Sequence, residues 1–203
     1  VGTGDKRLVA LDSTSGDIIW ERDVISPVDS SPAVAGDLVY FAAREGRLLA
    51  LDKETGETVW EFKPGEPIAS SPAVIDGVVY FGSDNRRVYA LDAITGKVRW
   101  SYLTGGRVLS DPALNDEVVA ITSLDGYLYL IDVNTGKRRL DYIFSYFRVS
   151  PAFVEDYVYM ADTRGYITAV DWRQREQPFE KAARKVRFHF YVWGWVDTAP
   201  QQK

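Results

Sequence analysis

Residues 90–100 read Ala-Leu-Asp-Ala-Ile-Thr-Gly-Lys-Val-Arg-Trp, and the chain returns to this stretch at a fixed spacing. It occurs forty residues earlier as Ala50 to Trp60, and again as Ala10 to Trp20. A weaker copy runs from Leu130 to Leu140, where leucine stands in place of the final tryptophan. Self-similarity at a period of roughly 20–50 residues is the signature of a repeat architecture.

One repeat unit reads as four short strands. In the unit that begins at Ser30, apolar runs cover 30–34, 38–42, 47–51 and 57–62, with a glycine at each tight turn and no helical periodicity. Such a unit is a four-stranded antiparallel meander. Meanders repeated in tandem bury their faces against one another, which predicts an all-β propeller. The alternative is an open β-sandwich, which has no reason to keep the period.

The repeats organise the chain into blades. We expect propeller repeats over 1–179, followed by a charged linker and an aromatic terminal strand over 180–203. The repeats divide into a partial blade, three intact blades and a degraded one, with the following bounds: 1–29, 30–69, 70–109, 110–148 and 149–179.

Closure of the ring has two solutions. The chain opens on Val1, and its first unit lacks its leading strands, so we expect a partial or truncated ring. Residues 186–196 alternate in pattern and could fill the missing strand, which would give a monomer of about five blades. The favoured alternative is a larger ring that missing sequence or another chain completes.

Composition excludes several functions. The net charge of −5 is spread along the chain, which argues against nucleic-acid binding, since that needs a concentrated basic face. No apolar run is long enough for a transmembrane helix. The sequence has no cysteine and only one histidine, His189, so it lacks the residues that a thiolate site or a histidine metal site needs.

Each residue type of the repeated stretch has a structural role. Aspartate at the turn can accept hydrogen bonds from nearby backbone N–H groups, and the glycine four residues later suits a positive φ. The small alanine at the start leaves room for a bulky neighbour, for which tryptophan is the candidate, so that each indole packs between adjacent blades. The predicted structural docking residues are Asp12, Asp52, Asp92, Gly16, Gly56, Gly96, Trp20, Trp60 and Trp100.

The pattern Ala-x-Asp-x-x-Thr-Gly-x-x-x-Trp resembles the tryptophan-docking motif of pyrroloquinoline-quinone (PQQ)-like repeats. The match is best at 50–60 and 90–100, Ser15 replaces the threonine in the first copy, and the resemblance covers roughly residues 1–171. The resemblance implies a β-propeller with more blades than this chain supplies. The family includes quinoprotein alcohol dehydrogenases and also cofactor-free scaffolds of the BamB type.

Two features exceed what the fold requires. The aromatic tract 142–148 stands where the sibling units carry short glycine-containing loops, at the same expected end as several arginines, and the tail 186–196 is apolar on both faces. Aromatic residues and arginine are enriched at binding hot spots. Alternatively, the tract covers an edge left open by Leu140, and the arginines form a solvated rim. The candidate partner-binding residues are Arg44, Arg86, Arg87, Phe144, Tyr146, Phe147, Arg148, Trp193 and Trp195.

The function expected from these observations is a non-catalytic scaffold. By the resemblance, it would bind a protein partner in the bacterial periplasm or at the cell surface, with outer-membrane protein assembly as one role and no cofactor. A first alternative is a fragment of a quinoprotein dehydrogenase that holds PQQ and calcium. For that site Asp84, Asp111 and Asp125 are the available carboxylates, although they read better as turn and surface residues. A second alternative is a surface domain that senses a ligand or glycan.

Overall fold

The computed structural model describes residues 2–3, 5–24, 28, 30–143, 149–161 and 167–173. All regular structure in these ranges is β-strand. The strands are β1 (Arg7–Leu11), β2 (Ile18–Asp23), β3 (Ala33–Ala35), β4 (Leu38–Ala43), β5 (Arg47–Asp52), β6 (Thr58–Phe62), β7 (Ala73–Ile75), β8 (Val78–Ser83), β9 (Arg87–Asp92), β10 (Val98–Leu103), β11 (Ala113–Leu114), β12 (Val118–Thr122), β13 (Tyr127–Asp132), β14 (Arg138–Ile143), β15 (Ala152–Val154), β16 (Tyr157–Ala161) and β17 (Ile167–Asp171).

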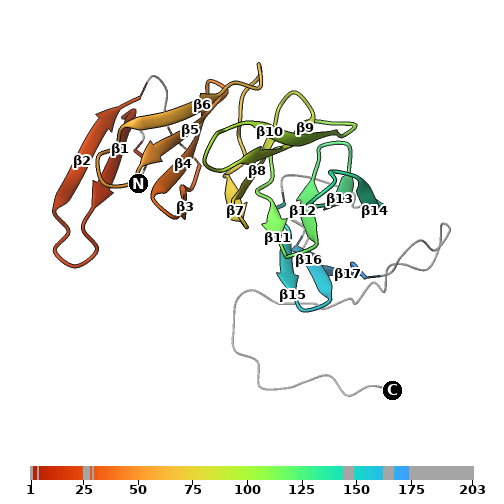
Figure 1. Cartoon of the computed structure of the whole chain (residues 1–203). Coiled ribbons are helices and arrows are strands. Elements are labelled where there is room, and N and C mark those ends of the chain that lie inside the picture. Colours follow the sequence, from red (N-terminus) through yellow and green to blue (C-terminus); the bar gives the residue numbers. More distant parts are fainter. Residues whose placement is uncertain are drawn as a thin grey trace, which may run out of the picture.

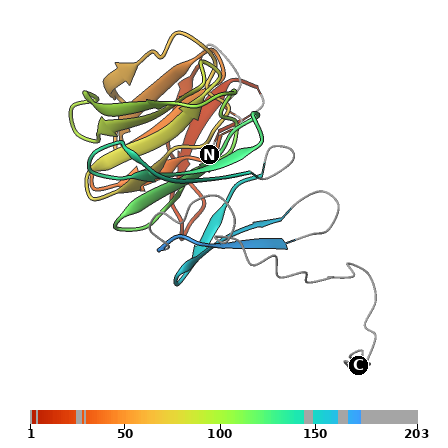
Figure 2. The same ribbon diagram turned by 90° about the vertical axis from the view of Figure 1, so that its right-hand side faces the viewer.

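The strands form five antiparallel meanders. Three sheets have four strands each, in the orders β3-β4-β5-β6, β7-β8-β9-β10 and β11-β12-β13-β14. They lie between a two-stranded sheet, β1-β2, and a three-stranded sheet, β15-β16-β17. The sheets follow one another along an open arc, with β1–β2 at one end and β15–β17 at the other (Figures 1 and 2). The predicted fold class, an all-β partial propeller with four-stranded blades, is confirmed, whereas the exact blade boundaries stay a prediction.

The first sheet keeps a remnant of a further strand. Gly2 forms an antiparallel bridge with Leu8, and the same register pairs Ala42 with Leu48 in the next sheet. Residues 2–3 therefore stand where the second strand of a complete blade ends.

Neighbouring sheets pack face to face through apolar side chains. Leu48 and Ala50 from one sheet lie in a single buried cluster with Phe81 and Leu91 from the next, and all four are at most 1% exposed. Similar clusters join the other neighbouring sheets. Because strands present alternate side chains to opposite faces, each inner sheet buries both faces.

A line of hydrogen bonds links the first strands of successive blades. The side chain of Ser71 accepts from the backbone N–H of Ser31 at 3.0 Å, and Asp111 Oδ1 accepts from the N–H of Ser71 at 2.5 Å. The hydroxyl of Ser150 in turn accepts from the N–H of Asp111 at 3.0 Å. These contacts fix the spacing of the inner strands along the arc.

Candidate functional site

The repeated aspartate organises the turn between the last two strands of each blade. Asp52 Oδ1 accepts hydrogen bonds from the backbone N–H of Glu54 at 3.0 Å and of Thr55 at 2.8 Å, and from the Thr55 hydroxyl at 3.0 Å. Gly56 closes the turn at φ 71°, a conformation that disfavours side chains. The hydrogen bonds from Thr55 and Glu54 lower the pKa of Asp52, because they stabilise its charged form.

The other copies of the turn have the same geometry. Asp12, Asp92 and Asp132 accept from the backbone N–H three residues later at 2.8–2.9 Å. The glycine that closes each turn has a φ of 67–77°. Hydrogen bonds from Arg99 and Thr95 lower the pKa of Asp92 to about 2. These aspartates are therefore occupied as turn caps.

Three of these turns, at 52–56, 92–96 and 132–136, each receive the tryptophan of the preceding blade. The indole Nε1 of Trp60 donates to the carbonyl of Ala93 at 2.9 Å, and the hydroxyl of Tyr40 donates to the same oxygen at 3.1 Å. A Cβ atom built on Gly96 would lie 2.7 Å from Cδ2 of Trp60, so only glycine lets the ring approach so closely. The contact thus combines a hydrogen bond from the indole N–H with close packing of the ring on the turn glycine.

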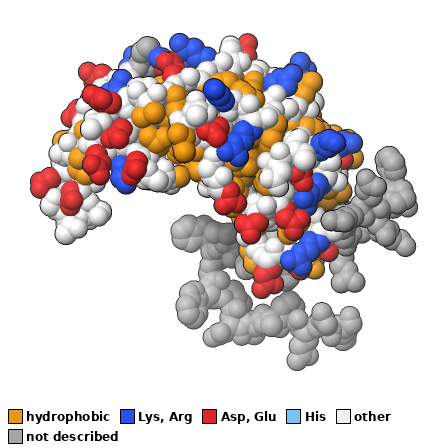
Figure 3. All heavy atoms as spheres, viewed as in Figure 1, with side chains coloured by type: hydrophobic (Ala, Val, Ile, Leu, Met, Phe, Trp, Pro, Cys, Tyr) orange, Lys and Arg blue, Asp and Glu red, His pale blue; other side chains and the backbone are white. Residues whose placement is uncertain are grey.

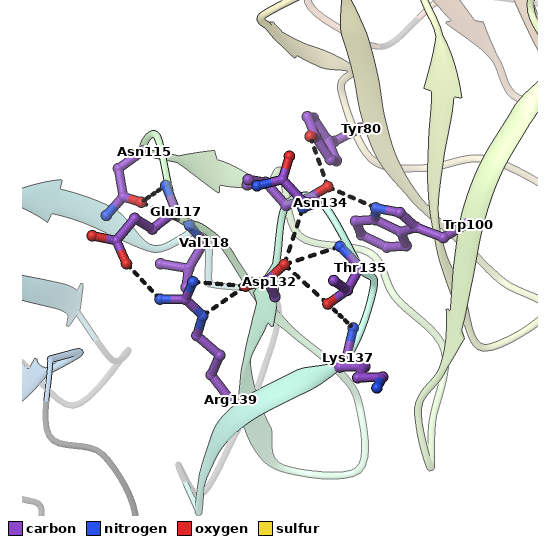
Figure 4. Close-up of polar contacts among 11 residues, drawn as sticks. Tyr80, Trp100, Asn115, Glu117, Val118, Asp132, Asn134, Thr135, Lys137 and Arg139 are labelled. Atoms are coloured by element: carbon purple, nitrogen blue, oxygen red, sulfur yellow. Dashed lines mark hydrogen bonds and ion pairs between the residues drawn. The ribbon is translucent and has the colours of Figure 1, made fainter.

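The same contact forms at the interface before this one and at the interface after it. Trp20 donates to the carbonyl of Lys53 and lies on Gly56, while Trp100 donates to the carbonyl of Val133 and lies on Gly136. Both hydrogen bonds measure 2.8 Å. Figure 4 shows Trp100 and Tyr80 reaching the turn that Asp132 organises.

The alanine at the start of the repeat has a different partner from the one predicted. Ala50 pairs across the strands with Trp60 of its own blade, and Ala90 pairs likewise with Trp100. The space for the indole from the neighbouring blade comes from the turn glycine, because a Cβ atom there would lie within 3 Å of the ring.

Arginine adds an ion pair to two of the turns, which sequence reasoning missed. Arg139 contacts Asp132 at 2.6 Å and Glu117 at 2.7 Å (Figure 4), and Arg99 contacts Asp92 at 2.8 Å. Burial acts to raise the pKa of Asp132, but hydrogen bonds from Arg139 and Thr135 outweigh it and lower the pKa. The available signal was an arginine one residue before the last position of the repeat, at 99 and 139.

At the last described interface between sheets, the tryptophan comes from the following sheet rather than from the preceding one. Leu140 cannot donate a hydrogen bond, and Trp172 from the next sheet lies in the same apolar cluster, together with Phe153. Trp172 is 9% exposed, and its Nε1 donates to the carbonyl of Glu155 at 3.2 Å. An aromatic residue thus fills this interface from the other side. The predicted covering tract 144–148 lies outside the described residues.

One end of the arc carries the candidate loop face, which consists of turns 44–46, 84–86 and 124–126 and of loops 63–69 and 103–109. Backbone hydrogen bonds join turns 84–86 and 124–126 to the loops that arrive from the preceding blades. The N–H of Asp84 donates to the carbonyl of Pro67, and that of Leu124 donates to Arg107, both at 2.9 Å. The loops and turns therefore form one surface, as the expected topology requires.

Arg86 stands out on this loop face. It is exposed and adopts φ 68°, whereas glycine occupies the equivalent positions 46 and 126. Its carbonyl accepts from the N–H and hydroxyl of Thr104, which holds the turn in place. No polar contact of its guanidinium occurs among the described residues.

The remaining candidate residues of the loop face are placed as follows. Arg44 is exposed on the preceding turn, and Arg87 donates to the hydroxyl of Ser101 at 3.0 Å. The other six predicted partner-binding residues lie outside the described residues: Phe144, Tyr146, Phe147, Arg148, Trp193 and Trp195.

The three carboxylates considered for a calcium site are engaged separately. Asp84 pairs with Arg107 at 3.2 Å, and Asp111 joins two inner strands. Asp125 accepts from the hydroxyl of Tyr129 at 2.6 Å and from the N–H of Gly105 at 2.7 Å. Burial, and then the hydrogen bond to Asp125, raise the pKa of Tyr129. Within the described ranges, no three acidic or histidine side chains converge to hold a metal ion.

Comparison with known families identifies the repeats. The family model described as "Outer membrane protein assembly factor BamB" matches residues 1–71 and 44–183. The chain belongs to this family. No curated protein sequence matches the chain.

Solved structures similar to this BamB-family chain include natural and designed proteins. BamB from Moraxella catarrhalis superposes with a TM-score of 0.77 at 23% identity, over 90% of this chain and 60% of that one. The computationally designed protein Ika8 gives 0.77 at 16% identity, over 92% and 59%, and the designed Ika4 gives 0.62 at 18% identity, over 70% and 91%. The chain thus spans about three fifths of the length of the Moraxella protein, and these likenesses concern the fold.

Proposed function

We propose that this chain is a non-catalytic scaffold that binds a protein partner through the loop face. The observation that carries the proposal is Arg86, an exposed arginine held in a left-handed conformation where glycine occupies the sibling turns. That conformation costs an L-residue roughly 1–2 kcal/mol. Backbone strain retained at an exposed turn is a pointer to function.

The chemistry of the loop face suits a polypeptide with acidic groups. The guanidinium of Arg86 has no polar contact among the described residues, and Arg44 and Arg87 lie on the same face. Arginine binds carboxylates through two parallel hydrogen bonds and is enriched at binding hot spots.

The polar residues of the repeat support a role without catalysis. The carboxylates of the turns cap backbone N–H groups, and Asp84, Asp111 and Asp125 each serve a separate local contact. Calcium needs several oxygen ligands around one point, and these three carboxylates do not converge. These three carboxylates therefore do not form a calcium site together, and we assign no step to a quinone cofactor.

Family membership supports the proposed location. The matching family is described as an outer-membrane protein assembly factor, and we propose a bacterial periplasmic or surface location, with a part in outer-membrane protein assembly. In the described ranges there is no helix with the length and apolar character needed to cross the bilayer.

Site-specific photo-crosslinking tests the loop face. A photoreactive phenylalanine analogue would replace Glu66, which is exposed on the loop face, and in a control it would replace Ile94, which is 75% exposed on a turn at the opposite end of its blade. In bacterial envelope extracts we expect a discrete adduct from position 66 and none from position 94. Equal crosslinking at both positions would refute a loop-face partner.

The variant Arg86→Gly separates binding from stability. Glycine relieves the left-handed strain, so the free energy of unfolding should stay level or rise by up to about 1 kcal/mol. When Arg86→Gly is combined with the photoreactive analogue at position 66, capture of the crosslinked partner should nevertheless fall. A catalytic role would instead be supported if PQQ, added with calcium, co-eluted with the protein in gel filtration.

A further inference from the structure

One loop of the loop face differs strongly from its sibling. Residues 103–107 read Leu-Thr-Gly-Gly-Arg, whereas the equivalent residues 63–67 read Lys-Pro-Gly-Glu-Pro, so that four of the five positions differ. At the other end of the same blades, turns 52–56 and 92–96 share the aspartate, the threonine and the glycine of the repeat. The change in loop 103–107 is therefore not part of the contact that joins the blades.

The altered loop makes room for Arg86. A Cβ atom built on Gly46, the equivalent glycine, would lie 2.5 Å from the carbonyl oxygen of Glu66. In the next blade, the Thr104 hydroxyl lies 2.7 Å from the equivalent carbonyl oxygen, and the Thr104 N–H donates to the carbonyl of Arg86 at 2.8 Å. The proline at position 64 has neither of these donors. Thr104 thus holds the loop in an arrangement that accommodates a side chain at position 86.

The same loop brings two leucines close to two arginines. We call them the leucine–arginine patch, which consists of Arg86, Leu103, Arg107 and Leu124. Leu103 pairs across the strands with Arg87, the neighbour of Arg86. The carbonyl of Arg107 accepts from the N–H of Leu124 at 2.9 Å. Leu103 is 53% exposed and Leu124 is 42% exposed, so the patch presents apolar surface beside guanidinium groups.

The two leucines are not required by the packing of the blades. Lys63 stands at the position equivalent to Leu103, and Arg44 and Asp84 stand at the positions equivalent to Leu124. Blades with these charged residues form the same four-stranded meander. Apolar side chains exposed beside polar ones are typical of the centre and rim of a protein interface.

The two arginines have different surroundings. The Arg107 side chain is 56% exposed and contacts Oδ2 of Asp84 at 3.2 Å, which holds its guanidinium on the patch. Arg86 is exposed, and its guanidinium has no polar contact among the described residues. Arginine binds a carboxylate through two parallel hydrogen bonds. Arg86 is therefore the group of the patch that suits an incoming carboxylate.

The distribution of charge favours an acidic partner at this end of the blades. The loop face has four basic and four acidic side chains. The turns at the other end have thirteen acidic and three basic side chains, counted over 12–17, 36–37, 52–57, 76–77, 92–97, 115–117, 132–137 and 155–156. Figure 3 shows acidic side chains gathered at the β1–β2 end of the arc, to which the first of these turns belongs. An acidic segment is thus repelled from the far end of the blades and meets no such excess on the loop face.

We propose that the leucine–arginine patch binds a protein segment in which a large apolar side chain lies beside acidic residues. The inference rests on the proposed function, since it names the chemistry of the partner that the loop face binds. The apolar side chain packs on Leu103 and Leu124, and a carboxylate binds the guanidinium of Arg86. Arg107 adds attraction over a longer range.

Crosslinking from within the patch tests the chemistry of the partner. The photoreactive analogue would replace Leu124, and mass spectrometry of the digested adduct from envelope extracts would read the partner's sequence. We expect a peptide with Asp or Glu within a few residues of a large apolar residue. An adduct with a lipid, or with a segment that lacks acidic residues, overturns the proposal. An adduct from position 66 but none from position 124 also overturns it and leaves the proposed function standing, whereas no adduct from either position refutes both.

Variants of the patch give a second measurement. With the analogue at position 66, Arg86→Glu and Leu124→Ser should each lower the yield of adduct about tenfold or more. The matched controls are Lys97→Glu and Ile94→Ser, which change exposed residues at the opposite end of the blade and should leave the yield unchanged. Circular dichroism checks that each variant is folded. A loss with Arg86→Glu but not with Leu124→Ser would indicate an anion without an apolar anchor and would overturn the proposal, as would equal losses in the controls.

Discussion

Gly96→Ala tests the docking of tryptophan on the turn glycine most directly. The new Cβ would lie 2.7 Å from Cδ2 and 2.8 Å from Cε3 of Trp60, well inside the ordinary carbon–carbon contact of roughly 3.5–4.0 Å. The indole cannot retreat freely, because its Nε1 is tied to the carbonyl of Ala93 at 2.9 Å.

The expected destabilisation is the sum of three effects. An L-residue at φ 67° costs roughly 1–2 kcal/mol, and overpacking of a close contact costs typically 1–3 kcal/mol. Stretching the indole hydrogen bond adds up to about 1 kcal/mol. We therefore expect Gly96→Ala to lower the free energy of unfolding by about 2–6 kcal/mol.

Gly16→Ala is the matched control, since Gly16 closes the same turn at φ 77° with nothing within 4 Å of the new Cβ. It should show only the backbone cost of roughly 1–2 kcal/mol. Urea denaturation of both variants and of wild type, at concentrations where the chain is monomeric, measures the difference. Equal destabilisation by the two substitutions would refute the reasoning, because the glycine would then serve the turn alone.

Three further predictions concern single positions. Ser83→Ala should lower the free energy of unfolding in urea by about 1 kcal/mol, because the Ser83 hydroxyl donates to the carbonyl of Pro67. Ser123→Ala at the equivalent position should be nearly neutral, because that hydroxyl is buried without a partner among the described residues. Equal losses of stability in the two variants would contradict this reasoning. The pKa of Asp92 is lowered to about 2, so this carboxylate contributes fully to stability above its ordinary pKa near 3.8 and loses that contribution as the pH falls toward 2. The melting temperature of Asp92→Asn should therefore fall less than that of wild type over this pH range. Parallel losses in the two proteins would argue against the capping role. Leu140→Trp should destabilise by roughly 1–3 kcal/mol rather than restore the repeat, because Trp172 already fills that cluster, and a raised melting temperature would show otherwise.

Much of the fold could be read from particular residues. The spacing of Trp20, Trp60 and Trp100 predicted the blades, because a contact repeated between identical units demands identical spacing. The bridge between Gly2 and Leu8 keeps the same spacing, because it matches the pairing of Ala42 with Leu48. By contrast, the reversed role of Trp172 could not be predicted, because it depends on which side of an interface has room for a ring.

The class of fold, the number of strands in each blade and the local turn can be predicted from the residue order, because they depend on the alternation of apolar residues and on contacts within a few residues. The group that meets each indole becomes known only once the blades are packed together. The indole packs on the glycine of the following blade rather than on the alanine of its own, and Arg86 keeps the positive φ that glycine adopts at the equivalent positions 46 and 126. Both depend on how separate segments are oriented in space, which the order of residues along one strand does not specify.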